Sequence, residues 1–522
     1  MPRPCQTPRS LAAVTVLLLA LSGCSSAELA SNDFDQSVDE GGDGDGDGDP
    51  TGPTGDEGTG NDTGTGDGDG EDEGTEPTGI EDPGLELDSC DPAVAHGLTY
   101  NLADAQSEAA AALVRESVLA GAGVVPSIPL SPQPFLNRFE FNYPPVEGPE
   151  LALVGELWKP PHNNLEAAPR YRMQVAIRGP QMSADQRTPI DLAIVVDLGP
   201  SMAGEPWALV EEALVAVEAA LVPGDRVTVI GAGEQPQVLI ASTIVDEPAP
   251  ALLSDSLATQ SLAGVADVAA AVGLAYETVA PQWAGQGQPR VLLISNGHFP
   301  LDAALVDLVE QHADAGHYLV ALGLGAPEGF AESAMRELAA EGRGPLLYDR
   351  TAEQLWIDLQ ERFTEHMIAV ATDLEVTLSL PPGLAIRDRD HLAAKLGDSE
   401  LAVLGPDDTI VFHHELEACA ELDPAAVVRF EVAWTDPSTQ ESKQTVWEQP
   451  VGQLGFGSMD TRKGAATVAY VRALRGYRDG RPQDESYGAL LDAISLIAEA
   501  LEAQPEDPDL LEMSQVLGKL EG

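Results

Sequence analysis

Apolar and polar residues follow two different patterns along the chain, and each predicts a different kind of element. Between residues 191 and 369, short apolar runs alternate with stretches whose apolar residues recur at helical spacing. The first run, residues 191–196, is apolar enough for a strand that is buried on both faces. The next stretch, residues 205–222, has the periodicity of an amphipathic helix, and Pro223-Gly224-Asp225 would end it.

The same alternation continues to residue 369. Further strands are expected at 227–230, 237–241, 290–294, 318–324 and 346–348, and helices at 264–280, 301–315, 330–340 and 351–369. Strands that alternate with helices predict an α/β fold with a doubly wound, mostly parallel sheet of the Rossmann-like type. Right-handed crossovers place helices on both faces of such a sheet, and ligands bind at the carboxyl ends of its strands.

A period of two residues marks the regions on either side of this domain. Strands are expected at 151–157 and 171–177 before it, and at 374–380, 409–412 and 427–434 after it. We expect the two groups to pair into one β-sandwich-like domain into which the α/β domain is inserted. The predicted units are an N-terminal helix and β flanking region at 100–185, the α/β domain at 186–369, a β-rich domain at 370–455 and a helical C-terminal region at 456–522.

The C-terminal region has the pattern of amphipathic helices, with apolar clusters at 465–474, 493–501 and 510–517. Such a tail could bind a partner, but packing on the sandwich is the favoured interpretation.

The first 24 residues have the order of a secretory signal. Arg3 and Arg9 precede an apolar run, residues 11–21, that is too short to span a bilayer as a permanent helix. The sequence Leu21-Ser22-Gly23-Cys24 resembles the bacterial lipobox, which implies that Cys24 carries acyl chains such as palmitate and that the chain is cut before it. A plain signal peptide with an incidental cysteine is the alternative. By resemblance to envelope lipoproteins, Ser25 favours the outer membrane over the inner one.

Residues 25–95 are expected to be an acidic, Gly/Asp-rich disordered tether. Residues 31–90 hold 21 acidic residues and neither lysine nor arginine. This segment cannot bury enough apolar surface to offset its chain entropy, and its like charges repel one another. A calcium-binding repeat is disfavoured, because the ligand spacing of a Ca²⁺ loop is absent.

Charge and cysteine content narrow the classes of function. The chain has 86 acidic and 27 basic residues and a formal net charge of -59, which argues against a nucleic-acid partner. Four cysteines and nine histidines are too few for a zinc or iron–sulfur framework. After maturation Cys90 and Cys419 would remain, and an oxidising compartment permits a disulfide between them. Two inert buried thiols are the alternative.

The first predicted strand ends in Asp197-Leu198-Gly199-Pro200-Ser201. This resembles the Asp-x-Ser-x-Ser motif of the von Willebrand factor type A (VWA) family, where it begins the metal-ion-dependent adhesion site. The segments 222–227 and 290–297 resemble the turn before the second strand and the strand that usually ends in Thr-Asp-Gly in that family. The flanking regions resemble secreted bacterial VWA lipoproteins.

The resemblance implies five positions whose oxygens would hold a divalent cation. Asp197 and Ser201 match, whereas Gly199 replaces a serine, Leu262 the threonine and Asn296 the second aspartate. This degenerate set predicts that the domain has no bound metal cofactor and no metal-dependent adhesion. A reduced Mg²⁺ or Ca²⁺ site is the alternative, formed by Asp197, Ser201, Ser261 and Ser295. The Asp197 carboxylate could also serve only to accept backbone N–H bonds.

Two further motifs resemble parts of enzymatic or metal-binding sites. Residues 199–203 are one residue short of a Gly-x-Ser-x-Gly nucleophile elbow, in which Ser201 would be the nucleophile and His298 a base. The order of acid and histidine along the chain does not fit that elbow, so this hypothesis is disfavoured. His413 and His414 are neighbours on a predicted strand and point to opposite faces, which favours a structural role.

These observations together predict a non-enzymatic, lipid-anchored VWA protein of the cell envelope. Its expected role is protein–protein interaction or scaffolding with an unidentified envelope protein, held at the membrane by the lipid anchor. A metal-dependent adhesin and a serine hydrolase are the alternatives.

Overall fold

The computed structural model describes residues 91–100, 102, 107–161, 170–246, 252–279, 287–387, 402–478 and 485–522. The chain divides into two compact units, Met1–Asp82 and Pro83–Gly522, and all described residues belong to the second. The predicted signal, Cys24, most of the tether and Cys90 lie outside the described residues. None of the described helices combines the length and the apolar character that crossing a membrane requires.

A six-stranded sheet forms the centre of the α/β domain, with the strand order β6-β5-β4-β7-β8-β9. Its strands are β4 (Ile190–Asp197), β5 (Arg226–Ala232), β6 (Gln237–Ile244), β7 (Gln288–Ser295), β8 (Tyr318–Leu324) and β9 (Leu346–Asp349). All neighbours are parallel except β6, which runs antiparallel to β5 at the edge. The predicted doubly wound, mostly parallel sheet is therefore confirmed.

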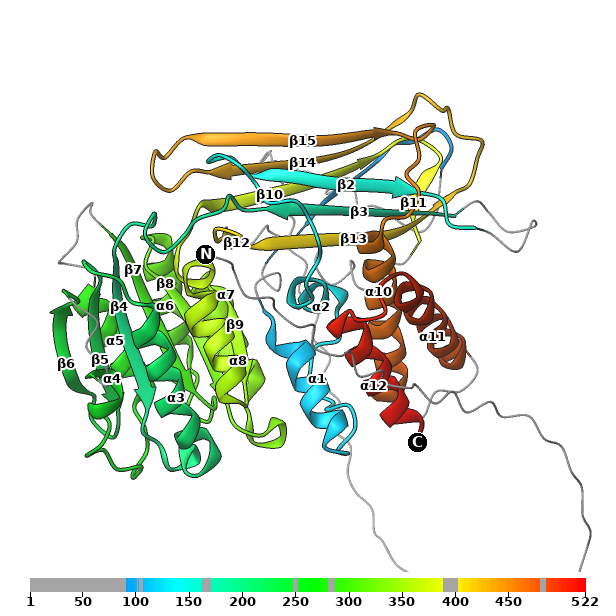
Figure 1. Ribbon diagram of the computed structural model, residues 1–522. Coiled ribbons are helices and arrows are strands. Elements are labelled where there is room, and N and C mark those ends of the chain that lie inside the picture. Colours follow the sequence, from blue (N-terminus) through cyan, green and yellow to red (C-terminus); the bar gives the residue numbers. More distant parts are fainter. Residues whose placement is uncertain are drawn as a thin grey trace, which may run out of the picture. The chain divides into compact units, whose positions relative to one another are not determined.

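Helices cover both faces of this sheet (Figure 1). They are α3 (Glu205–Ala220), α4 (Leu252–Asp255), α5 (Val268–Val279), α6 (Ala303–Asp314) and α7 (Glu332–Glu341). Successive residues of β4 point to opposite faces, so Ala193 and Val195 pack with α5 while Ile194 and Val196 pack with α3. Burial on both faces explains why the strand sequences are continuously apolar.

Two predicted helices have different bounds in the structure. The helix expected from residue 264 begins only at Val268, because Gly264 has a φ of +77° and residues 264–267 form a loop. The helix expected at 351–369 is broken into α8 (Ala352–Trp356), a π-helical turn η4 (Ile357–Glu361) and α9 (Phe363–Met367).

The π turn follows from the spacing of the buried residues in that segment. Leu355, Leu359, Phe363 and Met367 are buried and lie four residues apart. A regular α-helix has 3.6 residues per turn, so it would rotate this row steadily away from the core. A wider turn keeps the row on the face that packs against the sheet.

Two antiparallel sheets form the sandwich, and the α/β domain is inserted between β3 and β10, as predicted. One sheet contains β1 (His96–Thr99), β10 (Ala371–Leu380), β14 (Val427–Thr435) and β15 (Ser442–Pro450), with β12 (Ala402–Leu404) beside β10. The other contains β11 (Leu384–Ile386), β13 (Thr409–Ala418), β3 (Arg170–Arg178) and β2 (Ala152–Trp158). Their inner faces share one apolar core.

Five helices from the two ends of the described chain pack together beside these domains. They are α1 (Ala109–Leu119), α2 (Pro132–Arg138), α10 (Met459–Arg478), α11 (Glu485–Ala503) and α12 (Pro508–Glu521). Their buried residues are continuous with the core on the α5 face of the α/β sheet.

Helix α10 lies directly against strands β3 and β13, so the tail packs on the sandwich as expected. At the contact, the Gln174 amide donates to the Tyr143 hydroxyl at 2.7 Å and its Oε1 lies 2.8 Å from His413 Nδ1. His414 lies on the opposite face, where its Nε2 is 2.6 Å from the Tyr100 hydroxyl. Both histidines are buried in hydrogen-bonded positions, which agrees with a structural role.

Cys419 is disulfide-bonded. Because Cys90 lies outside the described residues, the pairing of these two cysteines stays a prediction.

Asp191 of β4 gives the first testable prediction. Its side chain is fully buried, and neither carboxylate oxygen has a hydrogen-bond partner in the part of the chain that the structure describes. Burial raises its pKa to about 6, opposed by the positive charge of Arg226. A raised carboxyl pKa stabilises the fold below the unfolded pKa of 3.8, and this stabilisation is lost as the pH rises through about 6. The loss corresponds to about 2–3 kcal/mol.

Asp191→Asn removes this titration. At each pH, the free energy of unfolding of the natural chain is subtracted from that of Asp191→Asn. We expect this difference to increase by about 2–3 kcal/mol from pH 4 to pH 7.5, because only the natural chain loses stability as Asp191 ionises. Urea denaturation of both proteins at the two pH values measures the difference, in which all other titrating groups cancel. A difference that does not depend on pH would contradict the prediction.

Candidate functional site

Asp197 ends β4 at the carboxyl edge of the sheet, and each oxygen of its carboxylate accepts a hydrogen bond from the protein. Its Oδ1 accepts a hydrogen bond from Gly199 N at 2.7 Å, and its Oδ2 accepts one from Ser295 Oγ, also at 2.7 Å. The side chain is almost completely buried. Burial raises the pKa of Asp197, while the hydrogen bonds from Ser295 and Gly199 and the nearby His298 oppose that rise.

Asn296 connects the loop after β7 with the loop after β4. Its side-chain amide donates to the Ser201 carbonyl oxygen at 2.8 Å, and its Oδ1 accepts from Ser201 Oγ at 3.2 Å and from His298 N at 3.2 Å. Ser201 itself lies exposed in a short 3₁₀ turn, Pro200–Met202. Asparagine can make this pattern because its amide carries both a donor and an acceptor, whereas an ionised aspartate only accepts.

The Ser295 hydroxyl also links the loop after β7 to Asp197. This hydroxyl donates to Asp197 and accepts from Gly297 N at 2.9 Å. Gly297 has a φ of +80°, and a methyl group at this position would lie 2.5 Å from the Ala331 carbonyl oxygen. The turn after β7 therefore requires glycine, and it holds Ser295 and Asn296 in place.

The second loop approaches the site through a residue that the sequence did not indicate. A methyl group at Gly199 would lie 2.9 Å from Asp197 Oδ1 and 3.5 Å from Ala266 Cβ, so Ala266 is the neighbour of Gly199. Leu262, which the resemblance placed here, packs against the apolar core on the α3 face of the sheet. Ser261 is exposed. The structure therefore places Ala266, and not Leu262, beside Gly199.

The structure thus brings together Asp197, Gly199, Ser201, Ser295 and Asn296, but it places Leu262 and Ser261 elsewhere. The assembled groups form a hydrogen-bonded network across two loops, and Ala266 contributes a methyl group beside it. Chemically, this arrangement can rigidify the loops and present the exposed Ser201 on the surface.

The geometry does not form the nucleophile and base of a serine hydrolase. Ser201 Oγ donates to Asn296 Oδ1, and His298 Nε2 lies 3.0 Å from the Gly329 carbonyl oxygen. A serine nucleophile needs a base that accepts its proton. Among the residues that the structure describes, no histidine nitrogen is paired with the Ser201 hydroxyl.

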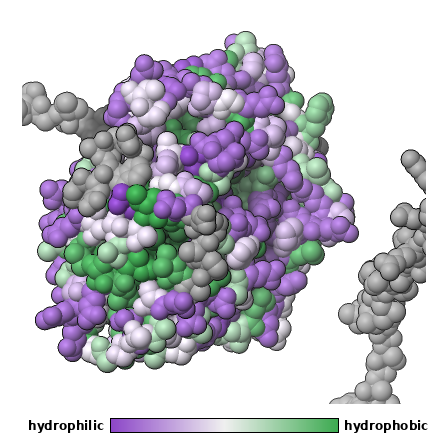
Figure 2. All heavy atoms as spheres, turned by 60° about the vertical axis from the view of Figure 1, so that its left-hand side comes forward, coloured by the Kyte–Doolittle hydropathy of each residue, from purple (hydrophilic) through white to green (hydrophobic). Residues whose placement is uncertain are grey.

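The surface of the α/β domain carries several exposed apolar side chains. Val238 and Ile244 of the edge strand β6 are nearly half exposed, and Val265 beside the site is 71% exposed. Figure 2, which brings forward the side of the molecule on which β6 lies in Figure 1, shows apolar residues gathered in one area between polar surroundings. Exposed apolar areas of this kind are common where proteins bind one another.

Comparison with known families agrees with the fold. Residues 190–347 match the model of the family described as von Willebrand factor type A domain. The chain therefore contains a VWA-like α/β domain, as the motif after the first strand predicted. Domains of this family are commonly protein-interaction modules. None of the curated proteins matches the chain.

Several solved structures are similar to parts of the chain. A von Willebrand factor type A protein from Catenulispora acidiphila is 15% identical, covering 67% of this chain and 87% of its own, with a TM-score of 0.44. The ArnB paralog VWA2 from Sulfolobus acidocaldarius is 13% identical, covering 71% of this chain and 98% of its own, with a TM-score of 0.40.

Proposed function

We propose that this protein is a lipid-anchored VWA protein of the cell envelope that binds another envelope protein, as an interaction or scaffolding module, without a metal ion in the adhesion site. The main support is the network around Asp197. Both oxygens of this carboxylate accept hydrogen bonds from the protein, one from Ser295 and one from Gly199. The carboxylate thereby has a structural role that needs no cation.

The residue types around Asp197 also disfavour a hard cation. Gly199 and Ala266 carry no side-chain oxygen, and Asn296 offers a neutral amide oxygen in place of a carboxylate. Mg²⁺ requires near-octahedral oxygen ligands and loses its water reluctantly, so a site with one carboxylate binds it weakly. In a reduced adhesion site, a metal ion would have to share the two Asp197 oxygens with the hydrogen bonds from Gly199 and Ser295.

Calorimetric titration with Mg²⁺, Mn²⁺ and Ca²⁺ tests this proposal. We expect the natural chain and the Asp197→Asn variant to take up each ion identically, because any uptake by the acidic N-terminal segment is common to both. Micromolar binding that is lost in Asp197→Asn would show that a metal-dependent adhesin is the correct interpretation.

The converse experiment restores the second carboxylate. Asn296→Asp should raise the affinity for Mg²⁺ by about tenfold or more relative to the natural chain, since cation affinity rises with the number of charged ligands. Asn142→Asp, at an exposed position outside this site, serves as the matched control in the same titration. Equal Mg²⁺ affinity in the natural chain and Asn296→Asp would mean that residue 296 does not control cation binding.

The partner should be captured without metal. Pulldown of the tagged full-length chain from envelope extracts is expected to retain the same protein in EDTA and in Mg²⁺ buffer. A partner that is released by EDTA would support the adhesin. Covalent labelling of Ser201 by a fluorophosphonate would instead support the hydrolase.

The membrane anchor is a separate part of the proposal and has its own test. Cells that express the chain and grow with an alkyne analogue of palmitate should label the protein, and Cys24→Ser should remove the label and release the protein from the membrane fraction. Acyl chains anchor a protein by burying methylene groups in the bilayer. Fractionation of the two membranes then tests the outer-membrane assignment.

A further inference from the structure

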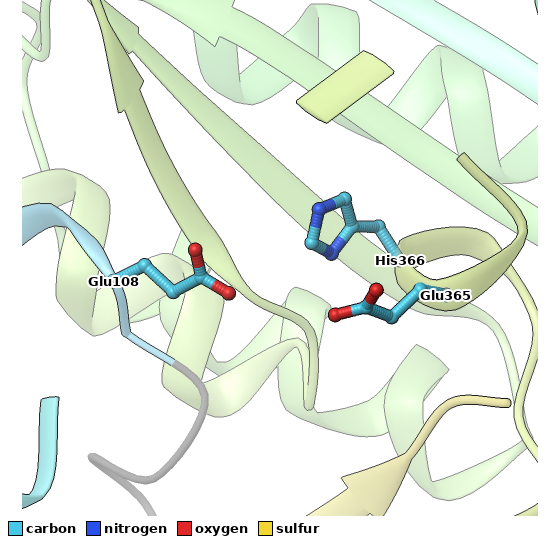
Figure 3. Close-up of side chains that lie close together, drawn as sticks. All are labelled: Glu108, Glu365 and His366. Carbon is cyan, nitrogen blue, oxygen red and sulfur yellow. The ribbon is translucent and has the colours of Figure 1, made fainter. Parts of the chain in front are cut away.

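A second group of polar side chains lies far from Asp197, where the chain before α1 meets α9. Glu108 immediately precedes α1, and Glu365 and His366 belong to α9. Figure 3 shows the three side chains directed towards one another. One carboxylate oxygen of each glutamate and one imidazole nitrogen of His366 all lie within 4.8 Å of one another.

Among the described residues, one nitrogen of the His366 imidazole has no hydrogen-bond partner. His366 is 9% exposed, and its Nε2 is buried without a hydrogen-bond partner. The ring edge that carries the two nitrogens faces the carboxylates in Figure 3. A buried polar atom without a partner is costly, and native structures usually satisfy it with protein, water or an ion.

Arginine already engages both glutamates, but it does not exhaust their capacity. Arg362 donates to both oxygens of Glu108, at 2.7 Å and 2.9 Å, and to both oxygens of Glu365, at 2.5 Å and 3.1 Å, and Arg138 donates to Glu108 Oε2 at 3.3 Å. An ionised carboxylate has about four lone-pair directions. Each glutamate therefore keeps lone pairs that can ligate a cation.

Carboxyl groups outnumber the arginines that pair with them around the cluster. Five carboxyl groups gather here: Glu108, Asp349, Asp358, Glu365 and Asp408. Arg138 and Arg362 are the guanidinium groups paired with them in the described part of the chain.

The space beside the three side chains is large enough for an ion. A cavity of about 30 Å³ is lined by Glu108, Glu365, His366 and Asp408. Arg290 and Arg343 also line it. Arg290 donates to the Pro289 carbonyl oxygen and to Gln288, and Arg343 pairs with Asp314. A volume of this size corresponds to about one water molecule or one metal ion.

We propose that Glu108, Glu365 and His366 form a binding site for one divalent transition-metal ion of the zinc class. One imidazole and two carboxylates are ligands that zinc accepts, whereas Mg²⁺ and Ca²⁺ prefer oxygen alone. Ligand atoms around tetrahedral zinc are about 3.4 Å apart for bonds of about 2.0–2.1 Å, so side-chain atoms that lie within 4.8 Å of one another must close by up to about 1.4 Å on binding. A water molecule in the cavity completes the coordination.

Such an ion would fasten the N-terminal helices to the α/β domain. Glu108 belongs to the segment that leads into α1, while Glu365 and His366 lie in α9 at the end of the α/β domain. Gly405 of the sandwich packs against the backbone of Glu365. The site is independent of the interaction function proposed above, because it shares no residue with the network around Asp197.

Cobalt spectroscopy on the full-length chain tests the site. After treatment with a chelator, Co²⁺ should produce intense visible absorption bands of a four-coordinate site with one equivalent bound, and Zn²⁺ should displace it. His366→Gln should abolish these bands and lower the Zn²⁺ affinity about 100-fold or more, since even outer-shell partners of a metal ligand contribute 10- to 100-fold. His298→Gln is the matched control and should retain the bands.

The outcomes separate this site from other cation binding. Carboxylates of the acidic N-terminal segment would give weak octahedral bands that are the same in both variants. Absence of the intense bands in the natural chain, or their persistence in His366→Gln, overturns the proposal. Because His366→Gln could misfold, X-ray absorption of the zinc-loaded natural chain provides a second test, and a spectrum without imidazole scattering also overturns it.

Discussion

Asp225→Asn is expected to lower the free energy of unfolding by about 3–5 kcal/mol, the largest effect that we predict for a single residue. Asp225 is fully buried and pairs with the buried Arg187, whose two terminal nitrogens donate to the carboxylate at 2.7 Å and 2.5 Å. The same carboxylate accepts from Ile190 N and Val222 N. Neutralising Asp225 leaves the Arg187 charge buried without its counterion, and desolvation of that charge is the cost.

A matched surface pair shows whether burial is the cause. Glu448→Gln breaks the exposed pair with Arg429 and should change the free energy of unfolding by at most about 1 kcal/mol. Urea denaturation followed by tryptophan fluorescence measures both variants, and Arg187→Met with and without Asp225→Asn completes a double-mutant cycle. A coupling energy near zero between residues 187 and 225 would refute the assigned role.

The elements that could be predicted from the sequence are those whose apolar residues form a continuous run or a clear period. Strand β4 is buried on both faces, so its continuous apolar run was sufficient to place it. Strand β15 was missed, because it lies at the edge of its sheet and alternates only between exposed and half-buried positions. Strands β11 and β12 have three residues each, which is too short for a periodic pattern.

The candidate site was predicted where its residues lie at strand ends, and it was missed where they lie in a loop of unknown length. Asp197 and Asn296 directly follow apolar strands, so counting from the strand ends located them correctly at one edge of the sheet. Ala266 sits in a loop whose length depends on where α5 begins, and the alanine-rich sequence does not mark that start. Ser295 was considered only as a metal ligand, whereas its hydroxyl holds the Asp197 carboxylate.

The cluster of Glu108, Glu365 and His366 could not be predicted from the sequence at all. Glu108 and Glu365 are far apart in the sequence. The hydrogen bond between Glu108 and Arg362, which lies three residues before Glu365, already spans 254 residues. Neither segment carries a metal-binding motif, and a glutamate next to a histidine is common on helices. The α/β domain is inserted between β3 and β10, and its last helix, α9, ends next to the segment before α1. This tertiary arrangement brings Glu365 and His366 to Glu108.

Gly405→Ala is the second variant from which we expect a large effect, a loss of about 2–3 kcal/mol in the free energy of unfolding. Gly405 lies in the loop between β12 and β13, where a methyl group would be 1.9 Å from the Glu365 carbonyl oxygen. That oxygen belongs to the backbone of α9, so no side-chain rotation can relieve the clash. The sandwich and the α/β domain must therefore separate locally, which loosens their junction.

Gly488→Ala makes the same chemical change where nothing is within reach, in helix α11, and it should stabilise the protein by about 0.5–1 kcal/mol through the lower backbone entropy of alanine. If urea denaturation shows that Gly405→Ala lowers the free energy of unfolding and Gly488→Ala raises it, the clash with Glu365, and not the glycine-to-alanine change itself, determines the cost at Gly405. Hydrogen exchange should also rise in α9 for Gly405→Ala and stay unchanged there for Gly488→Ala. A metal ion bound by Glu365 and His366 would stabilise the same helix, so Zn²⁺ should reduce the rise in hydrogen exchange in α9. If Gly405→Ala leaves the exchange rate in α9 unaltered, the tight junction at Gly405 is contradicted.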